Sequence, residues 1–448
     1  MKSSRFVCVM AAGLMTAVST WAQWQTQKTL ANNAYQGSIA LDGSGNAIAI
    51  WYQNAVNGTL TEEIWASNAT FGGAWSTPVD ISGGTDSDSG PAYPIVHTSA
   101  AGFSTAVYTN TTVGESFVDR PAGGPWGSSR VLNGVGFIGA NQFFVADTNG
   151  DQGLAWGTGG ARASSSTVMA VRRPSGGTWS APATLAAAPH LAFDGALVAP
   201  DGSMAVAWES FNATCGSRTC TTSNWVLHVS TLAAGSQSWV DSGALLGPDT
   251  TQHWGQLAAD TVGDLGLIAL KAGNVVSVVR HGSTTWSSVV TVIPDTNFQF
   301  VAAGTGRDNR IYASDSAGHA TLVGWANPQL TSLAAIDGNL TTNTWGSPAT
   351  ISGSDQYPGY FDFAMNASGA AIVFYPLSLQ SSPTPWRAIM RPGAGKAWGA
   401  PATAGTSFDA GGTPDGVAIN AAGQAAVVFH GESSDYTTQL LYTNTYKP

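Results

Sequence analysis

The amino-acid sequence predicts an all-β protein, an eight-bladed β-propeller of four-stranded antiparallel blades, and three observations support this prediction. A tryptophan recurs along the whole chain at intervals of 47 to 60 residues. Each interval holds the same succession of short extended segments separated by glycine-rich turns. The chain ends 50 residues after the last of these tryptophans, where a further repeat would begin. The recurring residues are Trp24, Trp75, Trp126, Trp179, Trp239, Trp286, Trp345 and Trp398.

The first half of each repeat contains a segment that follows the tryptophan and a strand that ends in a sharp turn. This turn has the form Asx-x-x-Gly and occurs at 42–45, 147–150, 260–263 and 366–369. An Asp or Asn side chain at the first position accepts a backbone hydrogen bond, and glycine at the fourth position takes the positive φ. The pattern therefore predicts a tight connection between two antiparallel strands.

The second half of each repeat begins with an apolar strand that carries alanine at alternating positions. Examples lie at 47–51, 204–208, 371–375 and 425–429. A strand that is apolar on both faces is expected to be buried, and small side chains let neighbouring sheets approach closely. A third strand and a glycine-rich turn lead to the next tryptophan. Four strands in a unit of about fifty residues are typical of a propeller blade.

The two ends of the chain are expected to complete one blade together. The last unit, 416–446, supplies only three strands, and segment 25–30 after Trp24 matches the missing outer strand. This closure would hide both free edges of the ring. Two alternatives stay open: a seven-bladed ring in which 299–324 is an insertion, and a stacked β-solenoid. The repeated tryptophans are expected to pack between sheets rather than bind a ligand.

Four arginines recur just before the glycine-rich turns that precede a tryptophan. A position that repeats with the blades is more easily explained by packing on the tryptophan ring than by catalysis. We therefore expect a structural role for them on the face opposite to the ligand. They are Arg120, Arg173, Arg280 and Arg391.

The first 22 residues have the features of a secretion signal. Lys2 and Arg5 give a positive start, 6–18 is apolar, and small residues stand at the expected cleavage position. The apolar run is too short to span a membrane. We expect removal of 1–22 and a secreted or periplasmic protein with one propeller domain, 23–448. Cys215 and Cys220 are then expected to form a disulfide, because the compartment is oxidising.

The charge of the mature chain excludes some classes of partner. The full sequence has 17 basic and 27 acidic residues, and loss of Lys2 and Arg5 leaves 15 against 27, a net charge of −12. Nucleic acids and anionic membranes need clustered lysine and arginine, so neither is an expected partner. We expect a monomer without a cofactor that binds a carbohydrate or another cell-surface ligand.

The repeat resembles bacterial propellers with a recurring tryptophan, namely the sialidase-like superfamily and the propeller lectins. The resemblance covers the whole of 23–448, is one of architecture, and implies binding or cleavage of sugars. The sialidase Asp-box, Ser-x-Asp-x-Gly-x-x-Trp, is absent, and the turns at 42–45 and 201–204 lack its spacing. No arginine triad and no repeated lectin motif is recognisable. No catalytic residue is therefore carried over.

In a propeller, the loops between blades and the loops between second and third strands meet on one face. Loops on a rigid scaffold commonly carry binding residues. Acids, amides and aromatic rings suit sugars, because an aromatic face stacks on the C–H side of a pyranose and carboxylates bind hydroxyls. The expected ligand-binding residues are Asp86, Tyr93, His253, Trp254, Tyr357 and Tyr360.

Three local features of these loops have two interpretations each. The pair His253-Trp254 is either a ligand platform with a general base or a satisfied histidine beside a packing tryptophan. The insertion 209–224 with its cysteine pair either contacts the ligand or is a stabilised surface excursion. Residues Asp147, Asn149 and Asp151 resemble a calcium loop. They coincide with the repeated turn and lack a downstream bidentate glutamate, so no metal is expected and calcium is a minor alternative.

The favoured function is an exported protein that binds a glycan or polysaccharide. The alternatives are a polysaccharide-active enzyme, either a glycoside hydrolase or a polysaccharide lyase, and a scaffold for protein interaction at the cell surface. The sequence leaves open whether the protein is an enzyme. The candidate catalytic residues are the acids Glu209, Asp355 and Glu432 and the bases His253 and His430.

Overall fold

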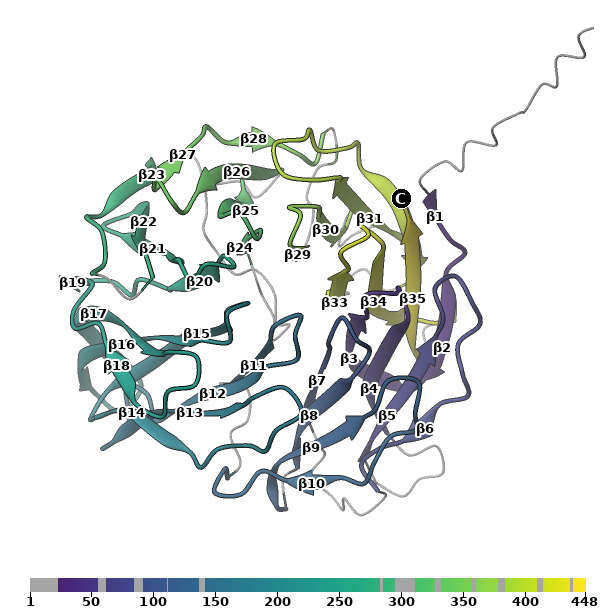
Figure 1. The fold of residues 1–448 in the computed structure, drawn as a ribbon, viewed down its shortest axis with the longest axis horizontal. Coiled ribbons are helices and arrows are strands. Elements are labelled where there is room, and N and C mark those ends of the chain that lie inside the picture. Colours follow the sequence, from purple (N-terminus) through teal and green to yellow (C-terminus); the bar gives the residue numbers. More distant parts are fainter. Residues whose placement is uncertain are drawn as a thin grey trace, which may run out of the picture.

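The computed structural model describes residues 23–54, 62–83, 92–110, 112–136, 142–282, 285–294, 311–326, 332–353, 355, 360–377, 383–408, 414–435 and 438–448. Within these ranges the chain forms strands and turns, and no helix that could cross a bilayer occurs. Eight antiparallel sheets stand around one axis as a closed ring (Figure 1). This ring confirms the eight-bladed prediction and removes the seven-bladed and solenoid alternatives.

In the first four blades the strands follow one another from the innermost outward. Blade 1 contains β3 (Ala34–Leu41), β4 (Ala47–Asn54), β5 (Glu62–Ala69) and β6 (Val79–Asp80). Blade 2 contains β7 (Ala92–Thr98), β8 (Ser104–Asn110), β9 (Gly114–Arg120) and β10 (Arg130–Val131). Blade 3 contains β11 (Gln142–Ala146), β12 (Gln152–Thr158), β13 (Ser166–Arg173) and β14 (Ala183–Ala188). Blade 4 contains β15 (Leu191–Val198), β16 (Met204–Cys215), β17 (Cys220–Leu232), β18 (Trp239–Asp241) and β19 (Leu246–Asp249).

The other four blades follow the same order. Blade 5 contains β20 (Gln256–Ala259), β21 (Leu265–Lys271), β22 (Asn274–Arg280) and β23 (Val290–Pro294). Blade 6 contains β24 (Tyr312–Ser314), β25 (His319–Trp325), β26 (Leu333–Asn339), β27 (Thr344–Trp345) and β28 (Ala349–Thr350). Blade 7 contains β29 (Asp362–Met365), β30 (Ala371–Pro376), β31 (Thr384–Arg391) and β32 (Ala402–Ser407). Blade 8 contains β33 (Pro414–Ile419), β34 (Ala425–Glu432), β35 (Gln439–Lys447) and the N-terminal strands β1 (Gln23–Trp24) and β2 (Lys28–Asn32).

The N-terminal strands close the ring by pairing with the last strand of the chain. Trp24 of β1 lies opposite Tyr446 of β35, and Lys28 of β2 lies opposite Thr443. The Trp24 and Tyr446 rings are 5.5 Å apart between centroids. In Figure 1 the purple N-terminal strands therefore run beside the yellow C-terminal strand. The outer edge of blade 8 is thus supplied by the other end of the chain, as the sequence predicts.

The core lies between the blades, and the repeated tryptophans belong to it. The second strands are its most buried parts, and every residue of β8 and of β30 is buried. All eight repeated tryptophans are half-buried, and each packs against one of the apolar clusters formed by the blades. A large aromatic at this position fills the space between adjacent sheets. The expected structural role of the tryptophans is therefore the observed one.

An arginine on the third strand joins neighbouring blades at three places. The guanidinium of Arg173 in blade 3 donates to Asp119 of blade 2 at 2.7 and 2.9 Å. Arg391 of blade 7 donates to Asp337 of blade 6 at 2.6 Å. Arg280 of blade 5 donates to a threonine of blade 4. These contacts tie blades 3, 5 and 7 to the blades that precede them.

The same three arginines also pack on the repeated tryptophans, as expected from the sequence. The guanidinium carbon of Arg173 is 5.9 Å from the ring centre of Trp179. The corresponding distances for Arg280 over Trp286 and Arg391 over Trp398 are 5.8 and 5.0 Å. The cation–π contact was predictable from the repeat, whereas the bond to the preceding blade was not.

We predict that Asp119→Ala lowers the free energy of unfolding by about 3 kcal/mol, because it leaves the buried guanidinium of Arg173 without its carboxylate. Burial alone raises the pKa of Asp119, but Arg173, Thr105 and Arg130 outweigh burial and lower it. Urea denaturation measures the change. Arg218 is exposed, so Arg218→Ala is the control and should alter stability by less than about 0.5 kcal/mol. Equal stabilities of Asp119→Ala and wild type would contradict the role of this ion pair.

Candidate functional site

The candidate site begins at a bulge in the innermost strand of blade 4. The pairing of β15 with β16 shifts register between Phe193 and Gly195, so Asp194 has no partner in the ladder. A bulge re-aims the side chain that it carries. The carboxyl group of Asp194 is hydrogen-bonded to that of Glu209 on β16. Asp194 and Glu209 are called the carboxyl clamp below.

The carboxyl clamp grips the loop 250–255, which joins blade 4 to blade 5. Glu209 Oε1 accepts hydrogen bonds from the backbone N–H groups of His253 at 3.0 Å and Trp254 at 3.1 Å. Asp194 Oδ2 accepts the backbone N–H of Gly255 at 2.9 Å. Three successive backbone donors of one blade are therefore fixed by two side chains of the preceding blade.

The imidazole of His253 is fully buried and lies between two acids. Its Nδ1 is 2.9 Å from Glu209 Oε2, and its Nε2 is 2.9 Å from Asp249 Oδ2 at the end of β19. Both ring nitrogens are therefore within hydrogen-bonding distance of a carboxyl oxygen. The side chain has an exposed fraction of 0%, so His253 positions the loop and does not face a ligand.

The clamp holds Trp254 in a backbone conformation that is unusual for a large residue. The φ angle of Trp254 is 54°, in the left-handed region. This conformation costs an L-residue roughly 1–2 kcal/mol, which the bonds to Glu209 offset. The side chain is nevertheless 54% exposed, so it is not held for core packing. The strained backbone and the exposed ring together make Trp254 a candidate for a functional position.

Burial controls the charge of the clamp. Burial raises the pKa of Asp194 well above its ordinary value, and the adjacent charge of Glu209 raises it further. Burial also raises the pKa of Glu209 to about 6, although the bonds from Asp194 and from the backbone N–H groups oppose the rise. Both carboxyl groups of the clamp therefore hold a proton more readily than exposed carboxyl groups do.

The candidate acid Asp355 lies in blade 7, apart from the clamp. Its Oδ2 accepts a hydrogen bond from the Tyr375 hydroxyl at 2.9 Å and lies 3.5 Å from Nε of Arg387. Burial and the adjacent carboxylate both raise the pKa of Tyr375. Asp355 is thus part of a local Tyr–Asp–Arg group.

Blade 8 repeats the geometry of the clamp with a different pair of side chains. Asp415 is the bulged residue of β33, and His430 follows on the second strand as Glu209 does in blade 4. His430 Nδ1 is 2.9 Å from Asp415 Oδ2. Glu432, two residues further, accepts a hydrogen bond from an amide side chain at 3.0 Å. Of the five candidate catalytic residues, the structure brings together Glu209 and His253.

The expected ligand-binding residues differ in their exposure. Trp254 is exposed beside the clamp, and Tyr360 in blade 7 is 38% exposed. Tyr93 is half-buried at the start of β7, and its N–H donates to Gln36 Oε1 at 2.9 Å. His253 is buried. Asp86 and Tyr357 lie outside the described residues.

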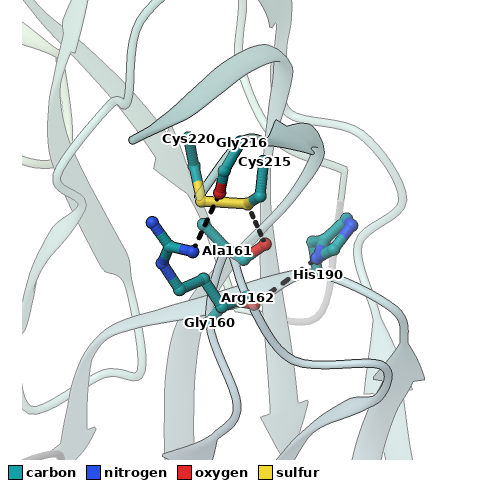
Figure 2. The surroundings of a disulfide bond; sticks show 7 residues. All are labelled: Gly160, Ala161, Arg162, His190, Cys215, Gly216 and Cys220. Carbon is teal, nitrogen blue, oxygen red and sulfur yellow. Dashed lines mark hydrogen bonds between the residues drawn. A yellow bond between two sulfur atoms is a disulfide. The ribbon is translucent and has the colours of Figure 1, made fainter. Parts of the chain in front are cut away.

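The insertion after Glu209 is a long hairpin that ends in a disulfide. Cys215 and Cys220 are bonded, as predicted, at the tip of the β16–β17 arm (Figure 2). Arg162 of blade 3 donates to the Gly216 carbonyl at 3.1 Å, and the Ala161 carbonyl oxygen lies 3.1 Å from Cys215 Sγ. The arm continues the strand that carries Glu209, so it rises from the same face as Trp254.

Aromatic stacking fixes the base of this arm. The rings of Phe211 and Trp225 are 4.0 Å apart and stacked, and the His190 ring lies 5.6 Å from Phe211. Both Phe211 and Trp225 are buried. The arm is therefore joined to blade 4 by stacking and to blade 3 by polar contacts, which makes it a fixed wall on this face.

The calcium-like segment forms the repeated turn. Asp147 Oδ1 accepts the N–H groups of Asn149, Gly150 and Asp151 at 2.8 to 2.9 Å. Asp151 in turn accepts the N–H of Ser175 at 3.0 Å. Within the described residues, no group of three or more His, Cys, Asp or Glu is placed to hold a metal ion.

Asp194 is the main residue that sequence reasoning missed. Its signal was the sequence Asp-Gly in the innermost strand, which recurs as Asp415-Gly416 in blade 8. An acid at a buried strand position has to find a partner. Aligning blades 4 and 8 on the turns of their inner strands would have matched Asp194 with Asp415 and Glu209 with His430.

Comparison with known proteins places the chain among structures of low similarity. No family model and no curated protein matches the chain. The polysaccharide lyase Uly1 aligns at 11% identity over 81% of this chain and 88% of its own, with a TM-score of 0.45. The six-bladed β-propeller lectin of Aleuria aurantia aligns at 13% identity, 84% and 97% coverage and a TM-score of 0.39. NanB sialidase from Streptococcus pneumoniae aligns at 11% identity over 94% of this chain and 70% of its own, with a TM-score of 0.35. These proteins supply no residue role for this chain.

We predict that Glu209→Gln removes a pH-dependent part of the stability. The pKa of Glu209 is raised from 4.5 to about 6, so its contribution is complete below pH 4.5 and is lost as the pH rises through about 6. The loss is on the order of 2 kcal/mol. Urea denaturation of wild type and variant from pH 4.5 to 8 measures the difference.

Glu432→Gln is the matched control, since Glu432 accepts a hydrogen bond from an amide side chain and has no place in the clamp. It should keep the pH dependence of the wild type. If Glu209→Gln kept that dependence as well, the assignment of the titrating group would be wrong.

Proposed function

We propose that this protein is an exported carbohydrate-binding propeller, with its site on the face built by the loops between blades. The observation that carries the proposal is the presentation of Trp254. Its ring is half-exposed while its strained backbone is fixed by the carboxyl clamp. A rigid aromatic ring loses little entropy when a pyranose stacks on it, and nearby acids such as Asp249 accept hydrogen bonds from sugar hydroxyls.

The geometry of the acids favours binding over hydrolysis. A glycoside hydrolase needs two carboxyl groups separated by roughly 5 to 9.5 Å, with the sugar between them. Glu209 is fully buried, and the imidazole of His253 lies between it and Asp249. Asp355, His430 and Glu432 belong to other blades and are bonded to protein partners. This arrangement suits a site that holds its ligand without cleaving it.

The proposal of export rests on the N-terminal segment and the disulfide. The segment 1–22 has a basic start and an apolar stretch. The Cys215–Cys220 bond in an exposed arm suits an oxidising compartment such as the periplasm or the cell exterior.

We predict that Trp254→Ala lowers saccharide affinity at least tenfold and leaves the melting temperature unchanged, because the lost ring contacts solvent rather than core. A glycan array and calorimetry on residues 23–448 measure binding, and a reducing-end assay measures cleavage. Binding without release supports the proposal. Release of reducing ends would replace it with an enzyme, and neither binding nor release would leave a protein scaffold.

Two controls separate binding from folding. Val262→Ala alters an exposed residue of the same blade in the turn on the opposite face and should change neither quantity. Trp286→Ala removes one of the repeated tryptophans and should lower stability by about 3 kcal/mol. Destabilisation by Trp254→Ala as large as that of Trp286→Ala would mean that Trp254 is a packing residue.

A further inference from the structure

Three aromatic residues share one register position in different blades. Tyr93, Trp254 and Tyr360 each stand six residues before the turn that ends the innermost strand of blades 2, 5 and 7. The turns begin at 99, 260 and 366. Because the blades are equivalent around the ring, this position lies where β7, β20 and β29 begin, around the centre of the ring in Figure 1. All three therefore belong to the face that carries Trp254.

Two of the three positions are built in the same way. The φ angles of Tyr93 and Trp254 are 71° and 54°. In both cases an acceptor from the preceding blade binds the backbone N–H of the aromatic residue: Gln36 Oε1 at 2.9 Å for Tyr93 and Glu209 Oε1 at 3.1 Å for Trp254. The left-handed conformation is rare for bulky residues. At both positions the backbone adopts a conformation that is unfavourable for a bulky residue, and both positions have the same register in their blades.

Tyr360 occupies the third of these positions, and the same register position can be compared in blades 1, 4 and 8. Tyr360 presents an exposed ring in the blade that carries the Tyr375–Asp355 pair. The equivalent residues of blades 1, 4 and 8 are Gln36, the half-buried Phe193 and the buried Pro414. The three aromatic residues are therefore separated from one another by at least one blade.

The charges near Trp254 indicate the class of sugar. Three acidic side chains, Asp194, Glu209 and Asp249, surround the single histidine His253 at this position. The whole chain has a formal charge of −10. An anionic polymer would be repelled from this face, whereas an uncharged one would not.

We infer that the ligand is an extended, uncharged saccharide chain that lies across the ring and contacts Trp254, Tyr93 and Tyr360 with different sugar units. This inference rests on the proposed function and adds the size and charge of the ligand. Contacts at several platforms on one rigid face raise the affinity of a chain above that of a single unit, because later contacts form within the complex.

The test uses neutral oligosaccharide series of one to eight units, from β-glucan, α-glucan, mannan and chitin, together with oligogalacturonates of the same lengths. Calorimetry on residues 23–448 should give an affinity for the longest neutral oligomer of one series at least tenfold above that of its monosaccharide. Tyr360→Ala and Tyr93→Ala should each lower that affinity about 3- to 10-fold, and Trp254→Ala should lower it at least tenfold.

Tyr360→Phe and Tyr93→Phe keep the ring and should keep the affinity, which separates stacking from structural effects. Tyr360 is the more informative of the two residues to substitute, because its exposed side chain can be removed without loss of folding. Monosaccharide affinity equal to that of the longest oligomer would overturn the inference and leave the proposed function. So would tighter binding of oligogalacturonate. Failure of every saccharide to bind would remove the proposed function itself.

Discussion

The pairing of β35 with β1 and β2 is the constraint on which the rest of the structure depends. A propeller blade has two long edges, and each inner strand is supported by the blades on either side of it. By supplying the outer edge of blade 8 from the N-terminus, the chain ties its first and last strands together through Trp24 and Tyr446. The eight sheets then form one ring, so a loop in one blade can be positioned by a side chain of its neighbour.

The candidate site uses this property of the ring. Asp194 and Glu209 belong to blade 4, while the backbone that they hold enters blade 5. Buried acids are expensive unless they are bonded, and each of these two accepts several hydrogen bonds. These hydrogen bonds keep Trp254 in a left-handed backbone conformation that an isolated loop would not maintain. Gln36 and Tyr93 show the same arrangement between blades 1 and 2, with an amide in place of the acid.

The fold was predictable from the sequence to a greater depth than the site. The number of blades and their closure were predictable from three features: the tryptophan period, the Asx-x-x-Gly turns and the match of 25–30 to a missing strand. Each blade needs the same packing residue and the same turn, so these features recur in the sequence. The Cys215–Cys220 disulfide followed from the secretion signal, because an oxidising compartment favours pairing of the two cysteines. The role of His253 did not follow, because a buried histidine between two carboxylates and an exposed histidine look alike in one sequence. Asp194 was missed because its partner lies on another strand and its loop contacts lie on another blade.

The central claim is that Trp254 contacts the saccharide while the repeated tryptophans hold the blades. The most direct measurement is ¹⁹F NMR of residues 23–448 labelled with 5-fluorotryptophan and titrated with a neutral oligosaccharide, with the Trp254 resonance assigned from its absence in Trp254→Phe. We predict that this resonance shifts on binding and that those of the repeated tryptophans do not, namely Trp24, Trp75, Trp126, Trp179, Trp239, Trp286, Trp345 and Trp398. A bound saccharide that leaves the Trp254 resonance in place would contradict it.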